Sequence, residues 1–110
     1  MATSELQVAV RERDGVAVID LVGDVNGLAG DALDRAYTEA TGTGATSVAL
    51  NFERTEFINS TGIALIVGLL AQARTHGVRV TATGLSDHYR EIFEITRLSD
   101  FMTIEGSSDA

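Results

Sequence analysis

The chain has 110 residues, of which 45% are apolar, so it can form one packed domain and is not a disordered tail. Its formal net charge of −8 argues against a nucleic-acid surface and an anionic membrane, because both select Lys and Arg. The absence of cysteine excludes disulfides, thiolate catalysis and cysteine-ligated zinc.

The N-terminal residues and the longest apolar stretch bear on where the protein resides. Residues 1–7 lack the basic and apolar regions of a secretory signal. Residues 63–71 are apolar but too few to span a bilayer. We therefore expect a cytoplasmic protein with a single domain over residues 1–110, ordered from about residue 5 to 105 and followed by a polar tail at residues 106–110.

The first part of the chain carries two strand patterns. Leu6, Val8 and Val10 alternate with polar residues, and residues 16–22 form a richer apolar strand. A turn signal at residues 13–15 separates them and predicts an antiparallel hairpin. Residues 23–27 are expected to break the second strand.

Two helices are predicted on either side of a buried strand. The first has six apolar residues on one face, at positions 29, 32, 33, 36, 37 and 40. Residues 47–52 form the strand that follows. The second helix runs from Ser60 to about Ala73, and Gly77 is placed to end it.

The remaining elements complete an alternating order. Residues 78–82 mark a fourth strand, Ser86 can cap a third helix, and residues 101–104 form a short last strand. The predicted order is β-β-α-β-α-β-α-β. Strands that alternate with helices indicate an α/β fold, with a mixed, mostly parallel sheet and helices packed against it.

Ser60 is the most informative position, because it lies between a buried strand and an apolar helix. The N-terminus of a helix carries unpaired N–H groups and a partial positive charge, so a phosphate added to Ser60 would meet an anion site. The structural alternative is that Ser60 simply caps the helix, since Ser is a preferred capping residue. The two roles can coexist.

The second helix is unusually apolar. Its natural core face is expected to contain five residues, at positions 63, 66, 67, 70 and 73. Leu65 and Leu69 then point nearly opposite the core. Either a neighbouring helix or loop covers them, or they form a protein-docking patch beside Ser60.

Catalytic chemistry finds little support in the sequence. Ser60 lacks the G-x-S-x-G elbow of a hydrolase. His76 and His88 have no metalloprotease spacing and are expected to be surface histidines. We predict no metal, no cofactor and no enzymatic activity.

Four segments in order resemble STAS-domain anti-sigma factor antagonists. Residues 57–63, Phe-Ile-Asn-Ser-Thr-Gly-Ile, resemble the phosphorylation motif of that family, Phe-hydrophobic-Asp-Ser-Ser/Thr-Gly-hydrophobic. Residues 23–26 are similar to the turn after the second strand, residues 47–52 to the central strand, and residues 88–93 together with Leu98 to the third helix. The resemblance covers about residues 5–105.

The resemblance implies a phosphorylation switch. Unphosphorylated members bind an anti-sigma factor that is also a GHKL-type serine kinase, and this binding releases a sigma factor. The kinase then phosphorylates the motif serine, here Ser60, and a PP2C-type phosphatase restores the binding form. The resemblance places the partner-binding face around Ser60, at Asp24, Asn26, Asn59, Thr61 and Gly62, to which the patch of Leu65 and Leu69 would add.

Two departures from the family pattern stand out. Asn59 and Asn26 replace residues that are usually Asp, which removes two carboxylates from one face. Thr61 is a second hydroxyl, but Ser60 aligns with the phosphorylated position. Family members often carry another helix after the last strand. The chain ends at Ala110, so this helix is expected to be absent and one side of the sheet barer, or covered by a self-contact in a homodimer or STAS–STAS assembly.

Other functions remain open at the level of sequence. A stressosome-like scaffold built from STAS domains is the first alternative, and it is slightly favoured by the patch of Leu65 and Leu69 and by the expected absence of the last helix. An accessory STAS subunit of a lipid-transport complex is the second. A nucleotide-binding role is weaker.

Overall fold

The computed structural model describes residues 6–42 and 44–105. Five strands form one sheet in the order β1-β2-β3-β4-β5. Their bounds are Gln7–Arg13, Val16–Val25, Ser47–Ile58, Arg79–Thr83 and Thr103–Ile104. Strand β1 is antiparallel to β2, and the other neighbouring strands are parallel, so the predicted mixed, mostly parallel sheet is confirmed.

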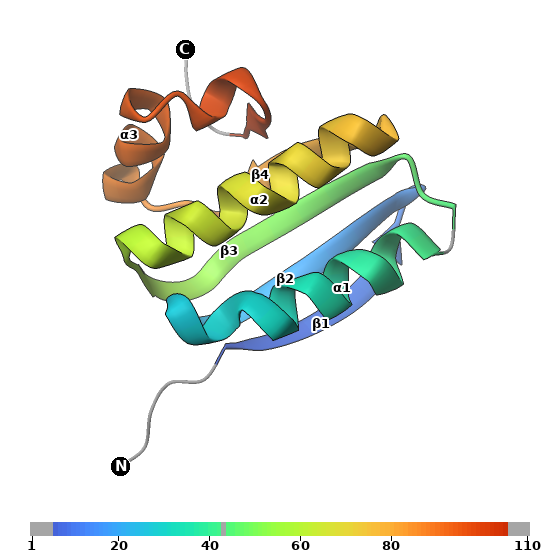
Figure 1. Cartoon of the computed structure of the whole chain (residues 1–110), viewed down its shortest axis with the longest axis horizontal. Coiled ribbons are helices and arrows are strands. Elements are labelled where there is room, and N and C mark those ends of the chain that lie inside the picture. Colours follow the sequence, from blue (N-terminus) through green and yellow to red (C-terminus); the bar gives the residue numbers. More distant parts are fainter. Residues whose placement is uncertain (1–5, 43, 106–110) are drawn as a thin grey trace.

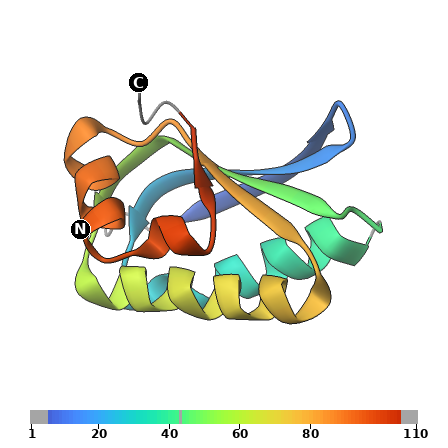
Figure 2. The same cartoon turned by 90° about the horizontal axis from the view of Figure 1, so that it is seen from above.

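Three α-helices connect the parallel strands: α1 (Gly30–Gly42), α2 (Ser60–His76) and α3 (Asp87–Ile95). Helices α1 and α2 lie side by side under the same face of the sheet (Figures 1 and 2). Helix α3 packs at the end of that layer, where the ring of Phe93 meets the ring of Phe52 edge-on at 5.8 Å between centroids. Two single-turn 3-10 helices, η1 (Gly27–Ala29) and η2 (Leu98–Asp100), complete the connections.

The core lies between the sheet and this helical layer. Alternate residues of the two central strands face it, and the most buried side chains include Ile19, Leu21, Val48 and Leu50. On α1, four apolar residues of the predicted face are buried: Leu33, Ala36, Tyr37 and Ala40. The helical period of apolar residues therefore located this face correctly.

The two central strands are longer than the sequence predicts. Strand β2 continues to Val25, although residues 23–27 were expected to end it, and β3 continues to Ile58 instead of stopping at residue 52. Gly23 has a φ of +114°, and the register of the two strands shifts on both sides of it. These irregularities break the alternation of apolar and polar residues and hide the strand extensions.

The structure confirms the predicted C-terminal end of α2 and the predicted N-terminal cap of α3. Gly77 ends α2 in the left-handed conformation, with φ +72°. Ser86 caps α3, because its hydroxyl oxygen accepts a hydrogen bond from the Tyr89 N–H at 3.2 Å.

Candidate functional site

Ser60 is the first residue of α2, and its side chain is exposed. The cap of this helix is Asn59, not Ser60. The Asn59 side-chain oxygen accepts the Gly62 N–H at 2.8 Å, and its carbonyl oxygen accepts the Ile63 N–H at 2.9 Å. The capping interpretation of Ser60 was therefore wrong, because the preceding residue already supplies the capping oxygen. The Ser60 hydroxyl is left facing solvent at the positive end of the helix.

The start of α2 is fixed against the end of β2 by backbone contacts. The Asn59 N–H donates to the Val25 carbonyl oxygen at 3.2 Å. Gly62 lies against the same carbonyl, and a Cβ added to Gly62 would be 2.0 Å from the Val25 oxygen. A glycine is thus required where the helix crosses the end of the strand.

The segment that follows β2 packs against the residue next to Ser60. Asn26 caps η1, since its side-chain oxygen accepts the Leu28 N–H at 2.9 Å. A Cβ added to the next residue, Gly27, would be 3.3 Å from the Thr61 Cγ2, so η1 rests on the first turn of α2. The structure therefore brings together five of the predicted site residues beside Ser60: Asp24, Asn26, Asn59, Thr61 and Gly62.

The charge of this region is negative. Residues 24–31 and 56–62 contain Asp24, Asp31 and Glu56 and no basic residue. Asp24 is paired with Phe57 across the sheet, and Asp31 lies in the first turn of α1. Although Asn26 and Asn59 lack a charge, three carboxylates remain on the segments that contact or adjoin Ser60.

The prediction that Leu65 and Leu69 form an exposed docking patch is wrong. Leu69 is only 5% exposed, and Leu65 is half-buried, with its Cδ2 atom 3.5 Å from the position of a Cβ on Gly30. Helix α2 has α1 as a neighbour as well as the sheet, which widens its buried arc toward these two leucines (Figure 1). Val67, which was expected to face the core, is 46% exposed instead.

Two exposed apolar side chains near Ser60 were not predicted as site residues. Leu28 is 76% exposed on η1, and Phe57 is 53% exposed near the end of β3. The sequence contained a signal for Phe57, which lies in the motif around Ser60. Leu28 had no clear signal, because a leucine in a glycine-rich turn can equally be a core residue.

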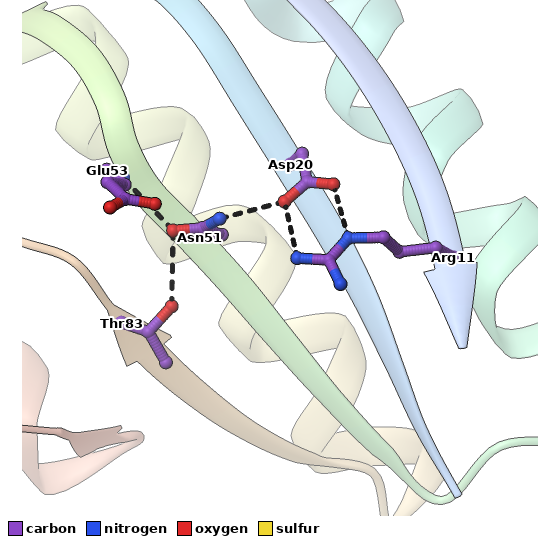
Figure 3. A network of polar contacts seen from close by, with 5 residues as sticks. All are labelled: Arg11, Asp20, Asn51, Glu53 and Thr83. Atoms are coloured by element: carbon purple, nitrogen blue, oxygen red, sulfur yellow. Dashed lines mark hydrogen bonds and ion pairs between the residues drawn. The ribbon is translucent and has the colours of Figure 1, made fainter. Parts of the chain in front are cut away.

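A row of polar side chains crosses the face of the sheet that lacks the three α-helices (Figure 3). Asp20 accepts hydrogen bonds from Arg11 at 2.7 and 3.2 Å and from the Asn51 side chain at 2.8 Å, and Thr83 donates to Asn51 at 3.4 Å. The bond from Arg11 is the main cause that lowers the pKa of Asp20, and burial opposes it. Because these groups satisfy one another, we assign the row to stability and not to ligand binding.

The part of the chain that the structure describes offers neither a metal-binding cluster nor a membrane-spanning helix. Among residues 6–42 and 44–105, no three His, Asp or Glu side chains are gathered as metal ligands would be. In the same part of the chain, no helix is both long enough and apolar enough to cross a membrane.

A sheet with one antiparallel edge strand, helices on one face and a hydroxyl at the start of α2 defines an α/β domain of a known class. The STAS domain family model matches residues 7–110, and the chain belongs to that family. The predicted resemblance to the family is thus confirmed.

Individual relatives agree with this assignment. The chain is 24% identical to an anti-sigma-B factor antagonist of Staphylococcus aureus over 104 residues, which covers 94% of this chain and 96% of the relative.

Solved structures share the fold. The crystal structure of an anti-sigma factor antagonist from Mycobacterium paratuberculosis superimposes with a TM-score of 0.79 at 16% identity, covering 96% of this chain and 90% of the other. The phosphorylated form of the Bacillus cell fate determinant SpoIIAA superimposes with a TM-score of 0.66 at 24% identity, over 93% and 92% of the two chains.

Proposed function

We propose that this protein is an anti-sigma factor antagonist whose binding is switched off by phosphorylation at Ser60. In its unphosphorylated form it binds an anti-sigma factor that is also a GHKL-type serine kinase, and this releases a sigma factor in the cytoplasm. The kinase phosphorylates Ser60, and a PP2C-type phosphatase reverses the modification. The protein acts by binding and is not an enzyme.

The observation that carries the proposal is the position of the Ser60 hydroxyl. It is exposed at the first position of α2, while Asn59 performs the capping that would otherwise engage it. Among the described residues, the amides of Ser60 and Thr61 have no hydrogen-bond acceptor, so they are free to bind phosphate oxygens. The fold can therefore accept the modification without rearranging.

The same position explains how a phosphate would break a complex. A phosphoserine adds nearly two negative charges. A partner that covers Ser60 would have to desolvate them on a region whose segments also carry Asp24, Asp31 and Glu56. Two unit charges about 5 Å apart interact by roughly 3 kcal/mol at an effective dielectric constant of about 20, which corresponds to a change in affinity of about a hundredfold.

The scaffold alternative loses one of its two sequence arguments. It relied in part on an exposed patch of Leu65 and Leu69, and Leu69 belongs to the core. No observation in the described residues favours the lipid-transport alternative over the switch.

The test is a phosphorylation and release assay with the purified anti-sigma factor kinase from the same organism. We expect mass spectrometry to find one phosphate, on Ser60, and calorimetry to show that the phosphorylated protein no longer binds. Ser60→Ala should bind the kinase in the presence of ATP without release, and Ser60→Asp should bind weakly. Modification that persists in Ser60→Ala would assign the acceptor to another hydroxyl, such as Thr61. Absence of both binding and modification would refute the proposal.

A further inference from the structure

We propose that Leu28 and Phe57 are the apolar anchors through which this protein docks on its anti-sigma factor, and that they insert into recesses rimmed by basic residues. This inference rests on the proposed function and specifies the chemistry of its partner. Leu28 is 76% exposed and Phe57 is 53% exposed, so each presents a large apolar side chain to water.

The conformation of Leu28 is held by specific contacts. Asn26 caps η1 through the Leu28 N–H, and Gly27 packs on the methyl group of Thr61. Leu28 therefore extends from a turn that is fixed to α2 at one end and capped at the other. Because the backbone of this turn is already fixed, binding through Leu28 requires little ordering of the backbone, which favours affinity.

Phe57 is held by the sheet. It pairs with Asp24, while its neighbour Ile58 is buried and donates its backbone N–H to the Tyr89 hydroxyl oxygen at 3.0 Å. Successive side chains of a strand point to opposite faces, so the burial of Ile58 directs Phe57 away from the helical layer. Aromatic residues of this kind often dominate the binding energy of an interface.

Ser60 lies on the short connection between the two anchors. Phe57 precedes the Asn59–Ser60–Thr61 segment, and Thr61 touches Gly27, the residue before Leu28. A partner surface that spans this connection between the anchors would cover Ser60. A phosphate at Ser60 would then stand inside an apolar contact, which is the position where its desolvation costs most.

The negative charges around the two anchors indicate which charge the partner carries around its recesses. Asp24 pairs with Phe57 across the sheet, Glu56 precedes Phe57, and Asp31 follows Leu28 by three residues. Residues 24–31 and 56–62 contain no Arg or His. Arg90, at the start of α3, is ion-paired with Asp87. A matching partner surface therefore carries Arg or Lys around its apolar recesses.

The test measures the affinity of the purified anti-sigma factor kinase for four single variants by calorimetry. Leu28→Ser and Phe57→Ser remove the anchors. Ile95→Ser and Phe101→Ser are matched controls, because Ile95 is 71% exposed and Phe101 is 52% exposed. Ile95 is the last residue of α3, and Phe101 lies on a turn beside Arg74, near the C-terminal end of α2. Circular dichroism and thermal melting confirm that each variant is folded.

We expect both anchor variants to weaken binding at least about tenfold while the controls stay within about twofold of wild type. Raising NaCl from about 50 to 300 mM should weaken wild-type binding, because it screens the complementary charges. Anchor variants that are folded and bind like wild type would overturn this inference but leave the switch at Ser60 intact. Salt-independent binding would overturn the basic rim. A wild-type protein that neither binds nor is phosphorylated would refute the proposed function itself.

Discussion

Gly62 is packed so closely against the carbonyl oxygen of Val25 that a Cβ on Gly62 would lie 2.0 Å from it. This contact joins the end of β2 to the first turn of α2, and with the hydrogen bond from Asn59 to Val25 it sets the position of Ser60. The site therefore depends on a backbone approach between two segments that are far apart in the sequence.

Gly62→Ala should lower the free energy of unfolding by about 1–3 kcal/mol or more, because backbone must move to admit the methyl group. Gly68→Ala in the same helix is the control. A Cβ at Gly68 meets nothing within 4 Å, so that substitution should stabilise the protein by up to about 1 kcal/mol. Urea denaturation measures both. Equal effects of the two substitutions would contradict the close approach.

Asn59→Ala should destabilise the protein by about 1 kcal/mol, since it removes the side-chain oxygen that accepts the Gly62 N–H. Ser60→Ala should change the free energy of unfolding by less than about 0.5 kcal/mol, because the exposed Ser60 is not the cap. Chemical denaturation distinguishes the two. If Ser60→Ala were the more destabilising, the assignment of the cap to Asn59 would be wrong.

Leu69→Ala should cost about 2–4 kcal/mol of stability, since Leu69 is 5% exposed within the core. Val67→Ala on the same helix should cost less than about 1 kcal/mol, because Val67 is 46% exposed. Thermal or urea unfolding of the two variants tests the corrected orientation of α2. A small effect at Leu69 together with a large one at Val67 would restore the orientation expected from sequence.

The ion pair on the open face of the sheet should make stability depend on pH. The hydrogen bond from Arg11 lowers the pKa of Asp20 below its ordinary value of 3.8, so the folded state favours the carboxylate. The resulting stability is present above about pH 4 and is lost as the pH falls through the lowered pKa.

Asp20→Asn cannot lose a charge and should therefore show a smaller loss of stability between about pH 6 and pH 2.5 than wild type. Urea midpoints of the two proteins at each pH give the comparison. Both Arg11 and Asp20 are partly exposed, so the difference should shrink at high salt. Parallel pH profiles of the two proteins would show that Asp20 is not coupled to Arg11.

Local patterns in the sequence were sufficient for the order of elements and for the ends marked by strong signals. The apolar period of α1, the glycine after α2 and the serine before α3 each act within a few neighbouring residues. The motif around Ser60 likewise identified the hydroxyl and its place at a helix start. Such features depend on backbone conformation and on hydrogen bonds between residues that are close in the chain. They can therefore be predicted from the sequence.

Features that depend on contacts between distant segments were decided by the tertiary structure. Leu69 is buried because α1 lies beside α2, and the periodicity of one helix cannot reveal how many neighbours it has. Leu28 is exposed on a turn whose Gly27 meets Thr61, a residue 34 positions later in the chain. The type of a side chain is fixed by the sequence, but its exposure is set by what the rest of the chain places against it.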